Sequence, residues 1–410
     1  MRLLHTSDWH LGQTLHRFER SYEHQCFLSW LLNTLVSEEI DGLLIAGDIF
    51  DNANPSASSH KQFYQFLQQA KIRVPRLQIV IIAGNHDSAA RLEAVEPLLS
   101  AMDITVTGHI VRTEGFQIDI DKLLVPLKNS TGEIAAWCLA IPFLRPGDVP
   151  RSDSGGDAYM EGITLLYQQA FECALSRRQS GQAIVAMGHC HMVGGEVSAD
   201  SERRIVIGGA EALSASVFDP IIAYAALGHL HLAQRVGRQE HLRYSGSPLP
   251  MSFAEIDYRH QVLCVELAGE SLLSVTEVVI PRAVELLRIP KQAAPVDEVL
   301  AQLLMLDLPL TDVCRHPYLE VRVKLDKPEP GLRARIEAAL DGKPVRLTRI
   351  ETSLCEKASD KVAAMSLDDL NRLRPDDIFK RLYESRYGTQ VPDAQLAAFE
   401  ELFLESDLIS

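Results

Sequence analysis

The sequence predicts an α/β fold, and three observations carry that prediction. Short apolar runs recur along the first part of the chain, helical stretches lie between them, and polar residues follow the runs directly. Runs that are rich in Val, Ile and Leu and lack alternation are typical of parallel strands covered on both faces. Strands that alternate with helices predict a layered α/β domain. The runs are Leu3–Leu4, Leu43–Gly47, Ile79–Gly84, Ile184–Gly188 and Ile221–Leu227.

The stretches between the first strands have helical periodicity. Residues Glu19–Ser37 place Phe27, Leu31 and Leu35 on one face, and Ala57–Ala70 has a similar pattern. A helix with one apolar stripe packs that stripe on a sheet. We therefore expect both segments to cover the sheet that the strands form.

A second unit is predicted after Pro281. Two helices alternate with three strands there, and the middle strand has a strict apolar alternation at Leu319, Val321, Val323 and Leu325. We assign residues 1–281 to the first domain and 282–350 to a small α+β domain. The predicted strands are Leu286–Ile289, Tyr318–Leu325 and Val345–Ile350, and the predicted helices are Val296–Leu306 and Leu332–Leu340.

The last part of the chain reads as a linker followed by a helical tail. Residues 351–365 lack periodicity, whereas within 366–410 Ser366 can cap a helix over Leu367–Leu373 and Pro375 can start another. Two apolar stripes fit either packing on the chain's own domain or docking into a partner's groove. The stripes are Ile378, Phe379, Leu382 and Tyr383, and Leu396, Phe399, Leu402 and Phe403.

Composition excludes several classes of protein. No apolar run in the 410 residues approaches the ~18 residues that span a bilayer. The first eight residues become polar too early for a signal peptide. Seven cysteines without a Cys-x-x-Cys spacing are expected to be reduced thiols. We therefore expect a cytoplasmic chain with no membrane association.

The net charge of −15 argues at first against a nucleic-acid partner. The charge is unevenly spread, however. Residues 1–281 hold 21 Lys and Arg against 32 Asp and Glu, whereas residues 282–361 hold 14 against 13. The second segment is therefore a different kind of surface, and the acidity of the whole chain does not describe it.

Five strand-end motifs carry the chemistry. Each is weak alone, because a single His at a strand end is more often a hydrogen-bonded structural residue. Together they supply two carboxylates, one amide oxygen and four imidazoles at one edge. Oxygen and nitrogen ligands without thiolate suit Mn²⁺ and similar ions, and seven ligands suffice for two ions that share a carboxylate. The ligands are Asp8, His10, Asp48, Asn85, His189, His229 and His231.

Two such ions predict hydrolysis of a phosphate ester. They would hold a phosphate oxygen and lower the pKa of a bridging water toward ~7. His86 stands beside a ligand but is not needed as one, so it could protonate the leaving alkoxide, and Asp87 could orient its ring. The alternative is that His86 is a satisfied packing residue.

The ordered motifs D-x-H, G-D, G-N-H-[DE], G-H and G-H-x-H resemble the calcineurin-like metallophosphoesterases. The resemblance implies a two-sheet α/β sandwich with a dimetal centre. It implies further that Asp8, His10 and His231 hold one Mn²⁺, that Asn85, His189 and His229 hold the other, and that Asp48 bridges them. His86 matches the leaving-group acid of the family. His191 also follows the fourth strand, but His189 directly follows the strand-ending glycine and is the expected ligand.

Further segments resemble the SbcD family of bacterial nuclease subunits. They are His5–Gly12, Ala46–Asp51, Ile141–Pro146 and Tyr244–Phe253. The resemblance implies a Mn²⁺-dependent nuclease of DNA repair, recombination and replication. Its activities would be double-strand exonuclease and single-strand or hairpin endonuclease, under an SbcC-type SMC-like ATPase. It also implies that 282–350 caps the active site and contacts DNA, and that 366–410 binds the ATPase.

The same resemblance implies a homodimer within a heterotetramer that associates with the nucleoid when it acts. We expect the dimer helices in Asn52–Leu67 and Ala89–Leu99. One departure from the family pattern is Asp51, where relatives from archaea and eukaryotes tend to have His. The direction in which those relatives digest DNA therefore cannot be assigned to this chain.

The DNA contacts are less sharply predicted. Arg145 lies in a proline-flanked loop, and Arg322, Lys324 and Arg346 belong to strands of the second unit. For any one of them a solvated charged face is the alternative. Two other functions stay open: a dimetal phosphatase or nucleotidase acting on small phosphoesters, and a non-catalytic scaffold.

Overall fold

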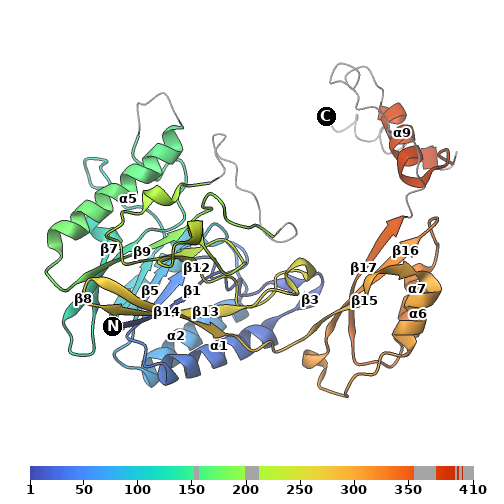
Figure 1. The fold of residues 1–410 in the computed structure, drawn as a ribbon, viewed down its shortest axis with the longest axis horizontal. Coiled ribbons are helices and arrows are strands. Elements are labelled where there is room, and N and C mark those ends of the chain that lie inside the picture. The colour runs from blue at the N-terminus through green and yellow to red at the C-terminus, as the bar shows by residue number, and fades with distance from the viewer. Residues whose placement is uncertain (152–156, 199–211, 355–374, 393–394, 397–398, 400–410) are drawn as a thin grey trace. The chain divides into compact units, whose positions relative to one another are not determined.

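The computed structural model describes residues 1–151, 157–198, 212–354, 375–392, 395–396 and 399. The chain forms two compact units, Met1–Glu285 and Leu286–Ser410 (Figure 1). The boundary falls four residues after the one expected from the sequence. Over the described residues, no helix is both long enough and apolar enough to cross a membrane, and the six described cysteines are free thiols.

The first unit contains two six-stranded sheets. The first sheet has the order β14-β13-β1-β4-β5-β6. Its strands β1, β4, β5 and β6 run parallel, whereas β13 is antiparallel to β1 and forms a hairpin with β14. The bounds are β1 Arg2–Thr6, β4 Gly42–Ala46, β5 Gln78–Ile82, β6 Ile104–Thr107, β13 Gln261–Ala268 and β14 Ser271–Val279.

The second sheet has the order β11-β12-β10-β9-β8-β7. Its strands β8, β9, β10 and β12 are parallel, and the two edge strands are antiparallel to their neighbours. The bounds are β7 Leu124–Lys128, β8 Ile134–Ala140, β9 Ala183–His189, β10 Tyr224–Gly228, β11 Gln234–Arg235 and β12 Leu242–Tyr244.

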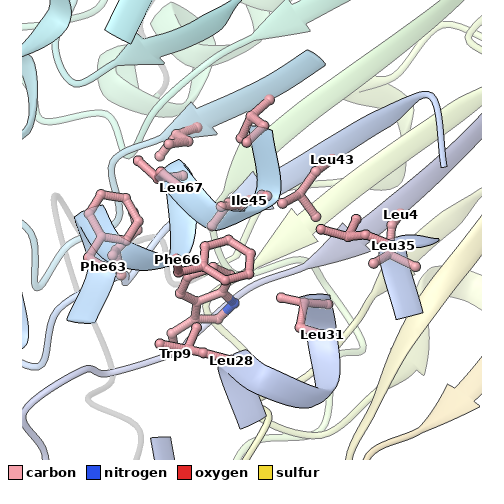
Figure 2. Close-up of a cluster of buried hydrophobic side chains, with 14 of the residues drawn as sticks. Leu4, Trp9, Leu28, Leu31, Leu35, Leu43, Ile45, Phe63, Phe66 and Leu67 are labelled. Carbon is pink, nitrogen blue, oxygen red and sulfur yellow. The ribbon is translucent and has the colours of Figure 1, made fainter. Parts of the chain in front are cut away.

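The two sheets pack face to face between outer layers of helices. One apolar core joins Leu44 and Ile82 of the first sheet to Val185 and Ala226 of the second. On the outer face of the first sheet, α1 (Ser21–Ser37) and α2 (Ala57–Arg73) enclose the core that surrounds Trp9 (Figure 2). The outer face of the second sheet packs on α5 (Ala158–Arg177). The predicted two-sheet α/β sandwich is confirmed.

Shorter elements complete the first unit. They are β2 Thr14–Leu15, β3 Phe18–Glu19, α3 Ala89–Glu93 and α4 Glu96–Ser100, with single turns of 3₁₀ helix that include Phe253–Glu255. The predicted helix over Glu19–Ser37 begins two residues later than expected, because Glu19 pairs in the β2–β3 hairpin. The fifth predicted strand begins at Tyr224 rather than Ile221. The Asp219 carboxylate accepts from the Ile221 N–H and its backbone carbonyl accepts from the Ile222 N–H, so these residues form a turn before the strand.

The second unit alternates strands and helices. Its sheet has the order β15-β16-β17, with all strands parallel. Two helices between consecutive strands make parallel crossovers, so the unit is α/β rather than the expected α+β. Its core includes Val299, Val321 and Ile336. The bounds are β15 Leu286–Pro295, α6 Val296–Leu304, β16 Tyr318–Leu325, α7 Leu332–Ala339 and β17 Arg346–Leu354.

The end of the chain differs in part from expectation. Strand β17 continues to Leu354, four residues into the segment expected to be a linker, and α9 spans Pro375–Tyr387. The Phe379 and Phe399 rings stack at 4.3 Å, so the two predicted apolar stripes contact each other. Leu382 stays 64% exposed. The predicted helix over Leu367–Leu373 and two residues of the second stripe, Leu402 and Phe403, lie outside the described residues.

Candidate metal centre

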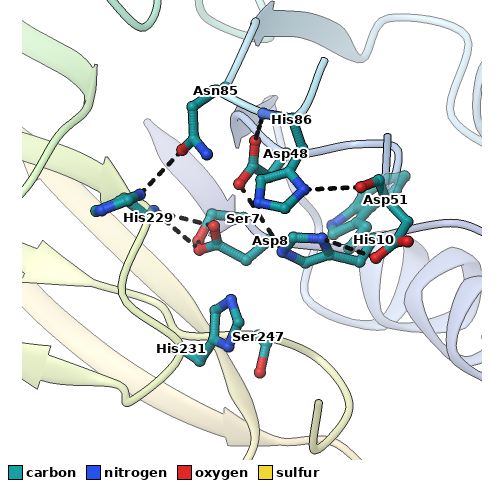
Figure 3. Close-up of polar contacts among 12 residues, drawn as sticks. Ser7, Asp8, His10, Asp48, Asp51, Asn85, His86, His229, His231 and Ser247 are labelled. Atoms are coloured by element: carbon teal, nitrogen blue, oxygen red, sulfur yellow. Dashed lines mark hydrogen bonds and ion pairs between the residues drawn. The ribbon is translucent and has the colours of Figure 1, made fainter. Parts of the chain in front are cut away.

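Five strand ends meet at one edge of the sandwich. Strands β1, β4 and β5 come from the first sheet, and β9 and β10 come from the second. The segments after β1 and β4 run side by side, because the backbone N–H groups of Asp8 and His10 donate to the carbonyls of Gly47 and Asp48 at 3.0 Å. His189 Nδ1 lies 2.9 Å from the Ala46 carbonyl and so links the two sheets. The candidate ligands gather there (Figure 3).

Four of the seven candidate ligands have left-handed backbone conformations. The φ angles are 55° at Asp8, 47° at His10, 51° at Asp48 and 103° at His229. Such conformations cost about 1–3 kcal/mol each and cluster at functional sites. None of the four is a glycine, so the positions keep their side chains at the expense of backbone strain.

Two glycines allow the strand ends to approach closely. Gly84 lies against Asp48, where an added Cβ would overlap the carboxylate. Gly47 has φ of +89°, and a Cβ there would overlap the His189 ring. A side chain at either position would therefore displace a candidate ligand.

The first ligand set consists of Asp8, His10 and His231. One ligand atom from each lies within 4.8 Å of the others, and all three residues are buried. Asp8 is fixed by the Ser7 hydroxyl, which donates at 2.5 Å, and by the backbone N–H of His229 at 2.9 Å. His10 Nε2 is buried and has no hydrogen-bond partner in the structure. Because an unpaired buried nitrogen is costly, its orientation into the cluster fits a metal ligand.

The second set consists of Asn85, His189 and His229. The Asn85 amide oxygen lies 3.0 Å from both His189 Nε2 and His229 Nδ1. These three atoms therefore converge on one point, as the ligands of one ion must. The division of the ligands into two sets stays a prediction, and His189 also lies within ligand distance of Asp8 and Asp48.

Asp48 lies between the two sets. Its Oδ2 is 3.8 Å from His10 Nε2 and 3.3 Å from His189 Nε2. Burial opposes ionisation of Asp48, but His189 and His10 outweigh it and lower the pKa of the carboxyl. An ionised carboxylate in contact with both sets is what a bridging ligand requires.

The histidines of the second set have opposite pKa shifts. Burial favours neutral His189, but Asp48 and Asp8 raise its pKa to about 9. Burial and the neighbouring His189 lower the pKa of His229 to about 3. His189 therefore carries a positive charge in the metal-free protein, and a divalent ion would take the place of that charge.

His86 lies beside the first set without belonging to it. Its Nδ1 is 2.7 Å from the carbonyl oxygen of Asp51, which can only accept, so Nδ1 carries the proton. The ring is half-buried and stands edge-on to His10 at 4.9 Å. Its backbone N–H donates to Asp48 Oδ1 at 2.8 Å. Nε2 is thereby left to exchange a proton, although His86 also lies within ligand distance of His10 and Asp48.

The prediction that Asp87 orients the His86 ring is wrong. The Asp87 carboxylate accepts from the backbone N–H groups of Ile49, Phe50 and Gly84 at 2.9–3.2 Å. Burial and Asp48 raise its pKa to about 6. Asp87 therefore holds the β4 and β5 loops together, and the Asp51 carbonyl orients the ring. Adjacency in sequence suggested the wrong partner because the side chain turns toward the neighbouring loop.

Two buried groups that support the ligands were missed by the sequence reasoning. Glu255 accepts from His231 Nδ1 at 2.9 Å, and Ser245 contacts Ser7 at 2.8 Å. Glu255 lies in a 3₁₀ turn 24 residues from His231, and no local spacing could have paired them. Ser245 lies within the Tyr244–Phe253 segment, and Glu255 lies two residues after it.

Two other residues of this region are where the sequence placed them. His191 is half-buried with its ring 6.4 Å from that of His229, and it belongs to none of the metal-capable groups found among the described residues. Trp9 is fully buried beneath the site and packs edge-on against Phe27, Phe63 and Phe66.

The candidate DNA contacts have different surroundings. Arg145 is exposed in the first unit, 5.6 Å above the Phe143 ring, which itself contacts His189 edge-on. In the second unit Arg322 is paired with Glu320 and Glu351. These pairs offset the charge of Arg322.

The remaining two candidates also belong to the second unit. Arg346 donates to the His316 carbonyl at 2.7 Å and lies 3.9 Å over the Tyr318 ring. Lys324 is exposed. Arg145 and Lys324 are therefore the accessible cations of the predicted set.

Comparison with known proteins identifies relatives of both units. The family model for calcineurin-like phosphoesterases matches residues 1–233, and the model described as the type 5 capsule protein repressor C-terminal domain matches residues 282–387. The D subunit of the SbcCD nuclease of Rhodobacter capsulatus is 40% identical over 92% of this chain and 93% of the relative. The proteins of the same name from Escherichia coli K12 and Bacillus subtilis are 32% and 33% identical, covering 93% and 99% of this chain and 92% and 97% of their own length.

Proposed function

Because the chain belongs to the calcineurin-like phosphoesterases and to the family of SbcCD nuclease D subunits, we propose that it is a Mn²⁺-dependent DNA nuclease. Its proposed activities are exonuclease on double-stranded ends and endonuclease on single strands and hairpins. The enzyme class, a metal-dependent phosphodiesterase, follows from the family. The ion, the DNA substrates and their regulation are the proposal.

One observation carries the proposal: the Asp48 carboxylate lies between the two candidate ligand sets, 3.8 Å from His10 Nε2 and 3.3 Å from His189 Nε2. The donors are carboxylate, amide oxygen and imidazole, which fits Mn²⁺ better than a thiolate-selecting ion. The buried, unpaired Nε2 of His10 fits an ion on the side of Asp8 and His231. When bound, two such ions would neutralise phosphate oxygens and lower the pKa of a water toward ~7.

Residues of the chain would supply the proton that the leaving group needs. His86 Nδ1–H stays on the Asp51 carbonyl, so Nε2 is the atom that delivers a proton to the departing sugar oxygen. The Asp87 carboxylate accepts hydrogen bonds from three backbone N–H groups of the loops that carry Asp48 and His86, and so fixes these loops. His86 thereby acts as acid without leaving its hydrogen bond.

The acidity of the chain shapes how DNA would bind. At a net charge of −15, non-specific attraction to phosphates should be weak and salt-sensitive. Arg145 stands near the second ligand set, and Lys324 is exposed in the second unit. We infer that these residues contact the DNA backbone and that partners supply much of the remaining positive charge.

The proposed partner is an SMC-like ATPase of the SbcC type, and the proposed assembly contains a homodimer of this chain. The relatives are named as D subunits of a nuclease called SbcCD, which implies a second kind of subunit. Leu382 of α9 is exposed and apolar, which favours helix-in-groove docking of the tail. We propose that residues 366–410 bind the ATPase and that residues 282–350 cap the active site.

A substrate comparison tests the proposal. The purified chain with Mn²⁺ is offered circular single-stranded DNA and, separately, mononucleotides. Nicking of the circle with little release of phosphate from nucleotides is the expected result. Rapid nucleotide turnover with intact circles would instead identify a phosphatase or nucleotidase, and a chain that binds no Mn²⁺ would identify a scaffold.

A further inference from the structure

The histidines of the two ligand sets are supported by groups of different charge. In the first set, Nδ1 of His231 lies 2.9 Å from the Glu255 carboxylate and Nδ1 of His10 lies 3.5 Å from the Asp51 carboxylate. In both rings the carboxylate faces Nδ1, so Nε2 is the nitrogen that would face an ion. The first set is thus supported by two carboxylates in addition to Asp8 and Asp48.

The second set lies against neutral groups. His189 Nδ1 lies on the neutral carbonyl of Ala46. His229 turns its Nδ1 toward the Asn85 amide oxygen, so that nitrogen is on the ligand side. The amide of Asn85 is itself neutral, and the carboxylates near this set are Asp48 and Asp8, which lie within ligand distance of His189 rather than behind its ring.

Glu255 is held rigidly behind His231. It is fully buried, and its second oxygen accepts from the Met251 backbone N–H at 2.7 Å. Arg20, paired with Glu23, donates to the adjacent Pro250 carbonyl and so fixes the same loop. Because both oxygens of Glu255 accept, the carboxylate fixes His231 as the Nδ1–H tautomer and presents Nε2 to the site.

We propose that Glu255 is a positioning residue for His231 and that, with Asp51 behind His10, it makes the first ligand set the tighter of the two ion sites. The inference rests on the two-ion centre of the proposed function and adds an order of filling to it. The ion held by Asp8, His10 and His231 binds first, and the ion held by Asn85, His189 and His229 exchanges more readily. A carboxylate behind a ligating histidine makes the ring more basic and adds attraction for the cation.

Metal titration of the full-length chain tests the order of filling. Mn²⁺ is added to metal-free protein, and free Mn²⁺ is measured by electron paramagnetic resonance, so no nuclease activity is needed. The wild-type chain should show two classes of site that differ in affinity. Asn85→Ala should lose the weaker class and keep the tighter one.

Variants behind the rings test the role of Glu255. Since loss of such a partner weakens metal binding about 10–100-fold, Glu255→Gln should weaken the tighter class by that factor. Asp51→Asn should weaken binding at the same class of site less, because the Asp51 side chain is one-third exposed. It provides the test of the inference if Glu255→Gln does not fold. Glu23→Gln is the matched control, because it removes a buried carboxylate from the same loop network without removing the group that faces His231.

Each outcome decides the inference. Loss of affinity in Glu255→Gln but not in Glu23→Gln supports positioning, whereas equal losses in both show that the loop only needs to be rigid. Unchanged affinities in Glu255→Gln and Asp51→Asn, or removal of the tighter class by Asn85→Ala, would overturn it. If wild-type protein cleaves DNA with Mn²⁺ while these affinities do not change, the proposed function stands and this inference alone fails.

Discussion

Replacing His86 by leucine separates acid catalysis from metal binding. The variant removes the ring nitrogen that would protonate the leaving oxygen and the 2.7 Å hydrogen bond to the Asp51 carbonyl. It leaves the backbone N–H that donates to Asp48, since that bond does not depend on the side chain. Stability should fall by about 1 kcal/mol, the usual net value of one hydrogen bond.

The effect on rate should be much larger than the effect on stability. A positioned general acid contributes about 10²–10⁴-fold, which corresponds to about 2.7–5.4 kcal/mol of activation free energy at about 1.36 kcal/mol per tenfold. We therefore expect nicking of single-stranded DNA to slow by that factor, measured as single-turnover cleavage with saturating Mn²⁺. Bound Mn²⁺ per chain should stay at the wild-type value.

A second substrate makes the prediction sharper. Bis(p-nitrophenyl) phosphate releases nitrophenolate, which leaves without a proton, so His86→Leu should slow its hydrolysis much less than DNA cleavage. His60→Leu is the matched control, since His60 lies on α2 and packs on Phe50 and on Tyr64 of the same helix. Equal losses on both substrates, or unchanged DNA cleavage, would refute the assignment of His86 as the acid.

Three other perturbations probe the close approach at the site, the tail and the buried histidines. Gly84→Ala should abolish Mn²⁺ binding in a calorimetric titration while the chain stays folded by circular dichroism, because the new methyl overlaps the Asp48 carboxylate; full binding would show that the close approach is unimportant. Deleting residues 366–410 should abolish co-purification with the ATPase and leave single-strand nicking intact, and a retained complex would exclude the docking role of the tail. Burial lowers the pKa of His5 to about 3 and of His24 to about 4, so the unfolded chain binds more protons below about pH 6.5. The free energy of unfolding of the metal-free protein should therefore decrease as the pH is lowered from about 6 to about 4, by about 1.4 kcal/mol per pH unit for each histidine. Urea unfolding that shows equal stability at about pH 6 and about pH 4 would contradict the burial argument.

The sheet and the ligand set were predictable because local pattern and chemistry agree there. Strand-end motifs fix both the direction of the chain and the type of donor, so the sequence alone could assign residues as distant as Asp8 and His229 to one edge. The four-layer arrangement follows from apolar runs that must be covered on both faces.

The parts that were missed depend on contacts between distant segments. Glu255 reaches His231 through a buried turn, and Asp87 turns from His86 to three backbone N–H groups of neighbouring loops. The charge of Arg322 is offset by glutamates on the same and the adjacent strand. Side-chain direction and pairing of this kind have no period in the sequence, whereas strands and helices do.

Cleavage of a DNA hairpin by the purified chain tests the central claim most directly. Wild-type protein and Asp48→Asn are incubated with an end-labelled hairpin in Mn²⁺ and, separately, in excess chelator. Because Asp48 is the carboxylate that contacts both ligand sets, we predict that the wild-type chain opens the hairpin with Mn²⁺ and not with chelator, and that Asp48→Asn does not open it. Intact hairpins with Mn²⁺-loaded wild-type protein, or equal cleavage by Asp48→Asn, would contradict the account.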